Sequence, residues 1–151
     1  AEPVLVSQGI DGDVPGKRFG DDSEIAFAPD GRSIVFAARI AGASEPWSTN
    51  HDLFEAPVDG SSAPVNLTDA NDASDTGPVF SPDGRTLYYR AFSRPGFEAD
   101  RYRILARDRA SGTTREIAAE WDRSAETLML SRDGRTLYTL ANDLGHNPLF
   151  A

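Results

Sequence analysis

The middle of the chain contains the ten-residue stretch Phe80-Ser81-Pro82-Asp83-Gly84-Arg85-Thr86-Leu87-Tyr88-Tyr89. The same pattern occurs before it as Phe27-Ala28-Pro29-Asp30-Gly31-Arg32-Ser33-Ile34-Val35-Phe36, and after it as Leu130-Ser131-Arg132-Asp133-Gly134-Arg135-Thr136-Leu137-Tyr138-Thr139. The aspartates of the three copies are about 50 residues apart, a spacing typical of proteins built from repeated supersecondary units. The 151-residue chain is therefore expected to consist of repeats.

Each copy predicts a β-hairpin. Its Asp-Gly pair is a strong turn signal, because glycine accepts the positive φ that tight hairpin turns require. The residues on both sides of the turn are rich in apolar, aromatic and β-branched types, which favour strands. We therefore expect paired strands at residues 24–28 and 33–37, at 77–81 and 86–90, and at 126–131 and 136–140.

Two further strands are expected in the complete units. A third strand follows the hairpin, and a tight turn at Asp59-Gly60 or Ser111-Gly112 leads to a fourth. Four antiparallel strands per repeat of about 50 residues are typical of a β-propeller blade. The sequence thus predicts an all-β fold, a partial β-propeller of four-stranded antiparallel blades. The third strands are expected at residues 51–58, 101–108 and 147–151, and the fourth strands at 64–68 and 114–118.

The repeat also predicts where each blade begins. Pro3-Val4-Leu5-Val6-Ser7 matches Pro64-Val65-Asn66-Leu67-Thr68, an expected fourth strand. Because known propellers typically close with 4–8 blades, these units predict a fragment of a ring. We assign residues 1–8 to the last strand of a blade, 21–69 and 74–120 to whole blades, and 124–151 to an incomplete blade.

Incomplete blades expose strand edges, whose free N–H and C=O groups are templates for association. We therefore expect self-association through these edges, with residues 3–7 of one copy completing the blade at 126–151 of another.

The composition restricts the partners of the chain. Its net charge of −9 and pI of about 4.6 argue against nucleic acid and against an anionic membrane surface. No apolar run approaches the ~20 residues of a membrane span. Without cysteine there is no disulfide or thiolate site. This leaves the compartment undecided, with a periplasmic or secreted location favoured. No cofactor and no metal site is expected; residues 69–75 have the Asp and Asn content of a cation loop, but lack the glycine and terminal glutamate of an EF-hand.

The repeat resembles the Ser-Pro-Asp-Gly blades of the TolB-like and prolyl-oligopeptidase groups. Two other stretches resemble bacterial serine peptidases of the prolyl oligopeptidase (S9) family, in the dipeptidyl aminopeptidase and acylaminoacyl peptidase group: Glu45-Pro46-Trp47-Ser48-Thr49-Asn50-His51-Asp52-Leu53-Phe54 and Arg94-Pro95-Gly96-Phe97-Glu98-Ala99-Asp100-Arg101. In that family a propeller restricts peptide access to a C-terminal α/β-hydrolase domain with a Ser-Asp-His triad. The resemblance therefore implies a non-catalytic propeller portion, with that hydrolase domain and a peptide substrate as partners.

No catalytic residue is expected in the chain itself. A hydrolase serine would stand in a Gly-x-Ser-x-Gly elbow, and the nearest stretch, Gly42-Ala43-Ser44-Glu45-Pro46, lacks the second glycine. The paired glutamates with which dipeptidyl peptidases of the family hold the substrate amino terminus are missing too. An alternative is a TolB-like propeller that binds proteins and has no enzymatic partner domain, since a fold does not fix a function.

The candidate site lies in the long loops after the second strands, at residues 40–50 and 91–100. Functional residues concentrate on long loops that rigid strands hold in place. The competing interpretation is loop packing with surface ion pairs. The residues expected to contact the substrate or the hydrolase domain are Glu45, Trp47, Asn50, Arg94, Phe97, Glu98, Asp100 and Arg101.

Overall fold

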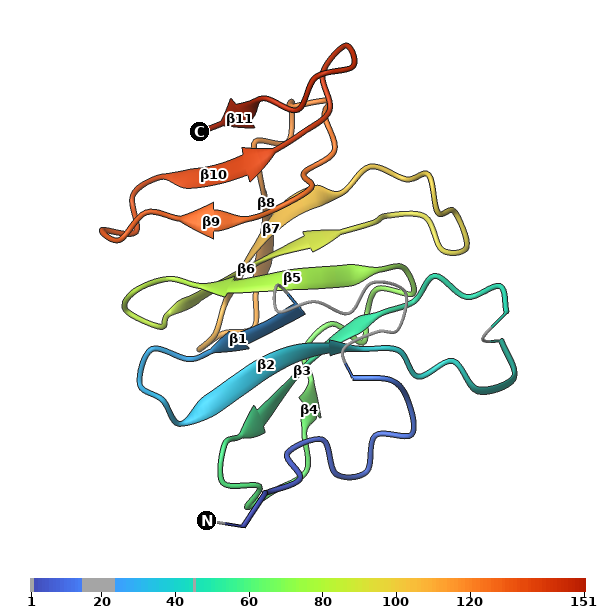
Figure 1. Ribbon diagram of the computed structural model, residues 1–151, viewed down its shortest axis with the longest axis vertical. Coiled ribbons are helices and arrows are strands. Elements are labelled where there is room, and N and C mark those ends of the chain that lie inside the picture. Colours follow the sequence, from blue (N-terminus) through green and yellow to red (C-terminus); the bar gives the residue numbers. More distant parts are fainter. Residues whose placement is uncertain (1, 15–23, 45) are drawn as a thin grey trace.

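The strands form three antiparallel sheets that follow one another along the chain and stack face to face (Figure 1). The structure, a computed structural model, describes residues 2–14, 24–44 and 46–151. The first blade contains β1 (Ile25–Phe27), β2 (Ser33–Ala38), β3 (Asp52–Pro57) and β4 (Val65–Asn66); the second contains β5 (Asp75–Phe80), β6 (Thr86–Ala91), β7 (Arg103–Asp108) and β8 (Thr114–Ile117); the third contains β9 (Met129–Leu130), β10 (Leu137–Leu140) and β11 (Leu149–Phe150).

This architecture confirms the predicted all-β fold and its antiparallel blades. In the first two blades each strand pairs with the next one along the chain, in the order of a four-stranded meander. The equivalent strands have the same register: Phe36 on β2 lies opposite Phe54, and Tyr89 on β6 lies opposite Leu105. The described residues do not close into a ring, as expected of a partial propeller.

Several predicted strands differ from the structure in extent, among them the one expected at residues 147–151, which is formed only at Leu149–Phe150. The strand expected at residues 126–131 is formed only at Met129–Leu130, and the one expected at 64–68 only at Val65–Asn66. Both lie next to a single neighbouring strand, so fewer ladder hydrogen bonds fix their ends. The strand expected from residue 77 begins at Asp75, and its register shifts between Thr76 and Val79 around Gly77. A glycine with a φ of +62° allows this bulge.

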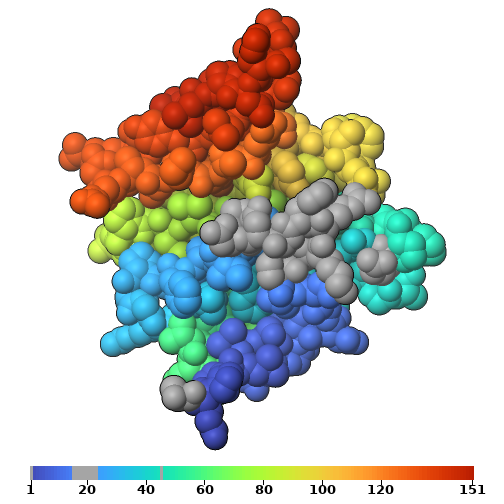
Figure 2. All heavy atoms as spheres, viewed as in Figure 1, coloured from blue at the N-terminus to red at the C-terminus, as the bar shows by residue number. Residues whose placement is uncertain are grey.

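The N-terminal segment is not a strand in the structure. Among the described residues, 2–5 have no regular secondary structure and 6–9 form a turn. The segment lies against the first blade, where the Gln8 side chain donates a hydrogen bond to Gly60 O at 2.9 Å. Figure 2 shows it in dark blue at the lower end of the molecule. The strand expected at residues 3–7 is thus absent here, and the assignment of residues 1–8 to a preceding blade stays a prediction.

The core lies between the first two blades. Val35, Ala37 and Leu53 of the first blade meet Leu87 and Tyr89 of the second, and all five are buried. Along β2 and β6 the side chains alternate between the two faces of the blade, so successive apolar residues pack on opposite faces. This explains why these strands are apolar at nearly every position, instead of alternating with polar residues as in a half-exposed sheet.

The second face of the first blade is also covered. Phe36, Ala38, Phe54 and Ala56 form a buried cluster there, with the two phenylalanine rings stacked at 6.2 Å between centroids. The N-terminal segment packs against this cluster through Val6, Ile10 and Val14. In the described parts of the chain, no helix has the length and apolar character needed to cross a membrane.

The repeated Asp-Gly turn is held by its own side chains. Asp83 Oδ1 accepts hydrogen bonds from Ser81 Oγ at 2.7 Å and from the Arg85 N–H at 3.1 Å, while Ser81 Oγ accepts one from the Thr86 N–H at 2.9 Å. The third blade repeats the same three bonds. The first blade has Ala28 in place of the serine and keeps only the bond to its aspartate. These bonds hold the pKa of Asp83 below its usual range.

Replacing a turn glycine with alanine is expected to destabilise the protein least at Gly31, more at Gly84 and most at Gly134. All three have a φ of about +70°, which costs an alanine about 1 kcal/mol. They differ in their neighbours: an added Cβ has nothing within 4 Å at Gly31, lies 3.5 Å from Pro29 at Gly84, and lies 2.9 Å from Pro82 at Gly134. Since a proline ring yields little, we expect a loss of about 2 kcal/mol at Gly134.

Thermal and urea unfolding of the three variants measures this order. Equal losses at the three sites would show that strain in the backbone, and not the contact with the preceding blade, decides the effect. An unchanged melting temperature in Gly84→Ala would contradict the turn assignment itself.

Candidate functional site

The two long loops extend from the same end of the first two blades, on the right of Figure 1. They connect β2 to β3 and β6 to β7. The loops are joined directly, because the Gly96 N–H donates a hydrogen bond to Thr49 Oγ1 at 2.9 Å. Thr49 is buried at this junction. Loops of neighbouring blades therefore form one continuous surface.

Asp100 fixes the conformation of the second loop. Its Oδ2 accepts hydrogen bonds from the Ser93 N–H at 2.8 Å and the Arg94 N–H at 2.9 Å, and its Oδ1 accepts two from the Arg94 guanidinium at 3.0 and 2.8 Å. Burial by itself would raise the pKa of Asp100, but these hydrogen bonds outweigh it and hold the pKa far below its usual range. The Asp100 carboxylate is thus ionised at neutral pH and ties the end of the loop to Ser93 and Arg94. We call this arrangement the Asp100 clamp.

An aromatic surface lies outside this clamp. The Arg94 guanidinium carbon stands 4.0 Å from the centroid of the Phe97 ring, a cation–π contact. The Phe97 side chain is exposed, and Trp47 on the neighbouring loop is 72% exposed. Exposed tryptophan, phenylalanine and arginine on a preorganised loop are the residue types that protein and peptide interfaces favour. We call Trp47, Arg94 and Phe97 the loop surface.

The other predicted site residues take different places. Glu98 is exposed on the second loop. Asn50 is half-buried, and its Oδ1 has no hydrogen-bond partner among the described residues. Arg101 turns toward the last strand of its blade, where it bonds to Glu116 and to the Trp121 carbonyl. The structure thus separates Arg101 from the loop surface, and Glu45 lies outside the described residues. The roles of all these residues stay predictions.

Neither long loop contains a catalytic motif in its sequence. The histidine beside the first loop, His51, makes contacts that hold the structure together. His51 Nδ1 lies 3.2 Å from Thr49 O. Burial lowers its pKa, so the imidazole is neutral at physiological pH. His51 also joins the blades, because its carbonyl accepts a hydrogen bond from the Asp75 N–H at 2.7 Å.

Sequence reasoning missed the buried arginine Arg90, which connects all three blades. Its guanidinium faces Glu24 of the first blade at 3.7 Å, bonds to the Glu126 carbonyl of the third, and lies 5.1 Å above the Tyr102 ring. The Glu24 carboxylate also accepts a hydrogen bond from Thr76 Oγ1. The available signal was a charged residue inside the otherwise apolar strand β6.

A second missed arginine lies nearer the Asp-Gly turns. Arg109 of the second blade forms an ion pair with Glu55 of the first, donates a hydrogen bond to Gly84 O at 2.8 Å, and stands 5.0 Å from the centroid of the Phe80 ring. Glu55 also accepts a hydrogen bond from Ser33 Oγ at 2.5 Å. Ionic contacts thus join the first two blades at both ends of their interface.

Asp75 is a fully buried carboxyl group between the first and second blades. Its Oδ2 accepts a hydrogen bond from Asn71 at 3.0 Å, but its Oδ1 has no partner among the described residues. Burial, with the nearby Asp52 charge, raises the pKa of Asp75 to about 7. Within the described residues no group of three or more histidine, aspartate or glutamate side chains is placed to hold a metal ion. The acidic stretch at residues 69–75 contains a turn and, at Asp75, a buried acid.

The Asp100→Ala variant is expected to open the second loop. Removing the carboxylate leaves two backbone N–H groups and the Arg94 guanidinium without their acceptor. We expect chymotrypsin to cut after Phe97 several-fold faster, while global stability falls by only about 1 kcal/mol because the loop is at the surface. The control is Glu120→Ala, at an exposed position outside the loop. Cleavage at the native rate would show that the loop does not depend on this clamp.

The comparisons with known proteins support the dipeptidyl peptidase part of the resemblance in the sequence. No protein-family model matches the chain. The chain is similar to dipeptidyl-peptidase 5 of Trichophyton equinum, at 32% identity over 141 residues, which is 87% of this chain and 19% of that protein. It is similar to dipeptidyl-peptidase 5 of Trichophyton tonsurans at 31% identity and of Arthroderma otae at 30%, with the same coverage.

The fold is that of a partial β-propeller, and the relatives to which the chain is similar are named as peptidases. More particularly, the similarity supports a dipeptidyl peptidase family. The chain spans about a fifth of the length of the curated relatives that it matches. Because these relatives are fungal, the expected bacterial origin stays a prediction.

Proposed function

We propose that this chain is the non-catalytic propeller portion of a serine-type dipeptidyl peptidase of the prolyl oligopeptidase family, and that it restricts peptide access to an α/β-hydrolase domain. One observation carries the proposal: 87% of the chain is similar to dipeptidyl peptidases, although its sequence contains no Gly-x-Ser-x-Gly elbow. The stacked blades give such a segment the rigidity that a barrier to large substrates requires.

The loop surface is the part proposed to contact the hydrolase domain or the entering peptide. Trp47 and Phe97 are exposed, and the Asp100 clamp and the Thr49–Gly96 bond hold their loops in place. Preorganised loops lose little conformational entropy on binding, so their aromatic groups contribute more to affinity. The acidic net charge of −9 also suits a partner or substrate with basic groups.

The test compares the isolated chain with the longer protein that carries it. The 151-residue chain is expected neither to hydrolyse a dipeptidyl-nitroanilide nor to react with a serine-directed phosphonate. The longer protein is expected to do both. In that protein, a Trp47→Ala/Phe97→Ala variant is expected to change the ratio of kcat/KM for long and short peptides several-fold, whereas Leu144→Ala, at a fully exposed loop residue of the third blade, is expected to leave it unchanged.

Turnover by the isolated chain that persists through repurification and is blocked by the phosphonate would overturn the proposal. So would a longer protein without a phosphonate-reactive serine. That second result would favour the TolB-like alternative, a propeller that binds proteins without an attached enzyme.

A further inference from the structure

Asp75, the first residue of β5, contacts the bases of both long loops. Strand β5 begins at the end of the blades from which these loops extend (Figure 1). The Asp75 N–H donates a hydrogen bond to the carbonyl of His51, directly before β3, at 2.7 Å. Its Oδ2 accepts one from Asn71 Nδ2 at 3.0 Å, and the same Nδ2 donates to the carbonyl of Phe92, directly after β6, at 3.2 Å. Asp75 therefore joins both loops to the blades.

The Asp75 carboxyl group is buried without a compensating charge. The residue has no exposed surface, and its Oδ1 lacks a hydrogen-bond partner among the described residues. Two charged side chains act on it from neighbouring strands: Asp52 on β3 opposes its ionisation and Arg103 on β7 favours it. The Arg103 guanidinium, however, is directed to the Glu116 carboxylate at 3.6 Å and to the Phe92 carbonyl at 3.2 Å. The arginine is thus engaged elsewhere.

The other titratable side chains around this junction do not supply a positive charge. Tyr89 on β6 is neutral, because burial and the charge of Asp75 raise its pKa. His51 is neutral at physiological pH, because burial lowers its pKa. Asp69 and Asp72 are exposed acids of the same loop. Ionised Asp75 would therefore be a buried charge without an ion pair among the described residues, which the fold disfavours.

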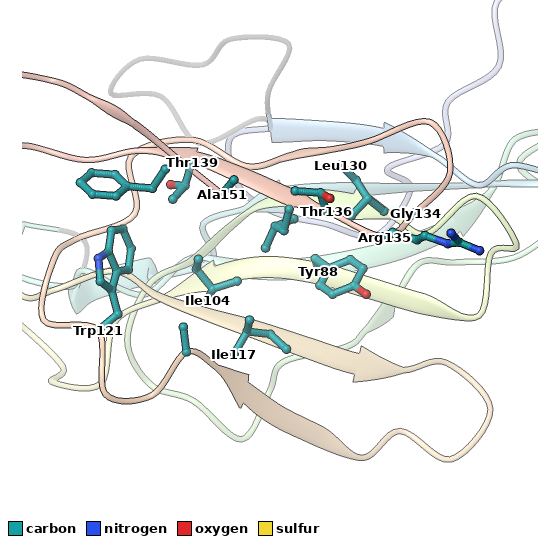
Figure 3. A pocket seen from close by; sticks show the side chains of 13 residues that line it. Tyr88, Ile104, Ile117, Trp121, Leu130, Gly134, Arg135, Thr136, Thr139 and Ala151 are labelled. Atoms are coloured by element: carbon teal, nitrogen blue, oxygen red, sulfur yellow. The ribbon is translucent and has the colours of Figure 1, made fainter.

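The junction between the second and third blades forms without such an acid. Ala125 is equivalent to Asp75, because each lies five residues before the repeated motif. Ala125 is also fully buried, and its N–H donates to the carbonyl of Tyr102, the equivalent of His51, at 3.0 Å. The same interface contains a pocket of about 520 Å³, and none of the described residues that line it is acidic (Figure 3). Stacking of the blades therefore does not require the carboxyl group of Asp75.

We propose that Asp75 is a pH-dependent switch for the two long loops: its neutral form keeps their bases joined to the blades, and its ionisation allows them to separate. Separation admits water to the carboxylate, which a buried charge requires. The blades need not unfold for this, since the apolar cluster of Val35, Leu53 and Leu87 can stay packed. An effect on peptide access would rest on the proposed function, but the switch itself does not.

The direction of the pH dependence follows from the two states of the carboxyl group. With the loop bases closed, burial raises the pKa of Asp75 from 3.8 to about 7. With the bases open, the hydrated carboxyl group regains its ordinary pKa. The open state therefore gains about tenfold per pH unit over the closed state between about pH 4 and about pH 7, and the ratio is constant above that range. The loops are held most firmly at acidic pH.

Amide hydrogen exchange between pH 5 and pH 8 tests the switch. The reporters are the N–H groups of Phe92 and Gly96, which donate hydrogen bonds to Ser74 O and Thr49 Oγ1 in the closed state. Their protection, corrected for the exchange rate of an unstructured peptide at each pH, is expected to fall at least tenfold from pH 5 to pH 7 and then to level off. In Asp75→Asn, which has a similar shape and no charge, it is expected to be independent of pH.

Two controls separate the switch from other effects of pH. Asp69→Asn removes an exposed acid of the same loop and should keep the native pH dependence. Amides of β7 should be more protected than the two reporters at every pH, because only the loop bases open. The proposal is overturned if the reporters of the native chain do not respond to pH, if Asp75→Asn responds equally, or if β7 and the loops are equally protected. No hydrolysis is measured, so the result does not depend on the proposed function.

Discussion

The Asp75→Asn variant is expected to be more stable than the native protein at pH 8 and equally stable at pH 4. The pKa of Asp75 is raised from 3.8 in the unfolded chain to about 7 in the fold. The folded state therefore binds this proton more strongly, and its stability falls as the pH rises from about 4 to about 7. A shift of this size corresponds to a difference of about 2–4 kcal/mol between the ends of the range. Asparagine has a similar shape and no charge, so it avoids this loss.

Urea unfolding of both proteins between pH 4 and pH 8 measures the effect. The difference between the two curves isolates Asp75 from the other titrating groups. Asp69→Asn serves as the control. Asp69 is exposed in the same loop, so this variant should show the same dependence of stability on pH as the native protein. Parallel curves for the native protein and Asp75→Asn would show that the carboxyl group titrates normally. A variant that is less stable at pH 8 would show that the charged form of Asp75 is stabilised by the fold.

The Arg90→Met variant is expected to lose about 3 kcal/mol of stability. Methionine preserves part of the side-chain volume but leaves the Glu24 carboxylate without its ion-pair partner and the Glu126 carbonyl without its donor. Both charged side chains are largely buried, at 11% and 19% exposure. Removing one partner of such a pair costs more than the pair itself contributes, because the remaining charge stays desolvated.

Two further variants identify the cause of this loss. Arg85→Met removes an arginine that is 85% exposed in its side chain, and it should change the stability by less than about 0.5 kcal/mol. Adding Glu24→Gln to Arg90→Met should recover part of the lost stability, since no buried charge then remains. If the double variant were as unstable as Arg90→Met, the loss would come from packing against Tyr102 and not from the ion pair.

The blades could be predicted from the sequence because their determinants are local. The Asp-Gly pair at Asp83-Gly84 specifies a turn, and the apolar residues on either side of it specify the two strands. The pairing then follows from the turn, as the register between Phe80 and Leu87 shows. The long loops were located correctly for the same reason, since they are what lies between two recognised strands.

The contacts between blades could not be predicted in this way. Strand β6 was recognised, but only the stacked structure shows that Arg90 reaches Glu24 and Glu126 across both interfaces. The burial of Asp75 likewise depends on how two blades fit together. The alternation of side chains along a single strand does not describe that fit. In the candidate site, the sequence predicted the loops but not the Asp100 clamp, which depends on how the chain folds back over six residues.

The contact between each turn and the preceding blade has a consequence for how the molecule unfolds. Gly84 rests beside Pro29 and Gly134 beside Pro82, so every junction repeats the same contact in one direction along the chain. In such linear arrays each unit is stabilised by its neighbours, and cooperativity extends from one unit to the next. The second blade alone has a described blade on both faces. In the 151-residue chain taken by itself, opening should therefore begin in the first and third blades, and amide protons in β6 and β7 should exchange last.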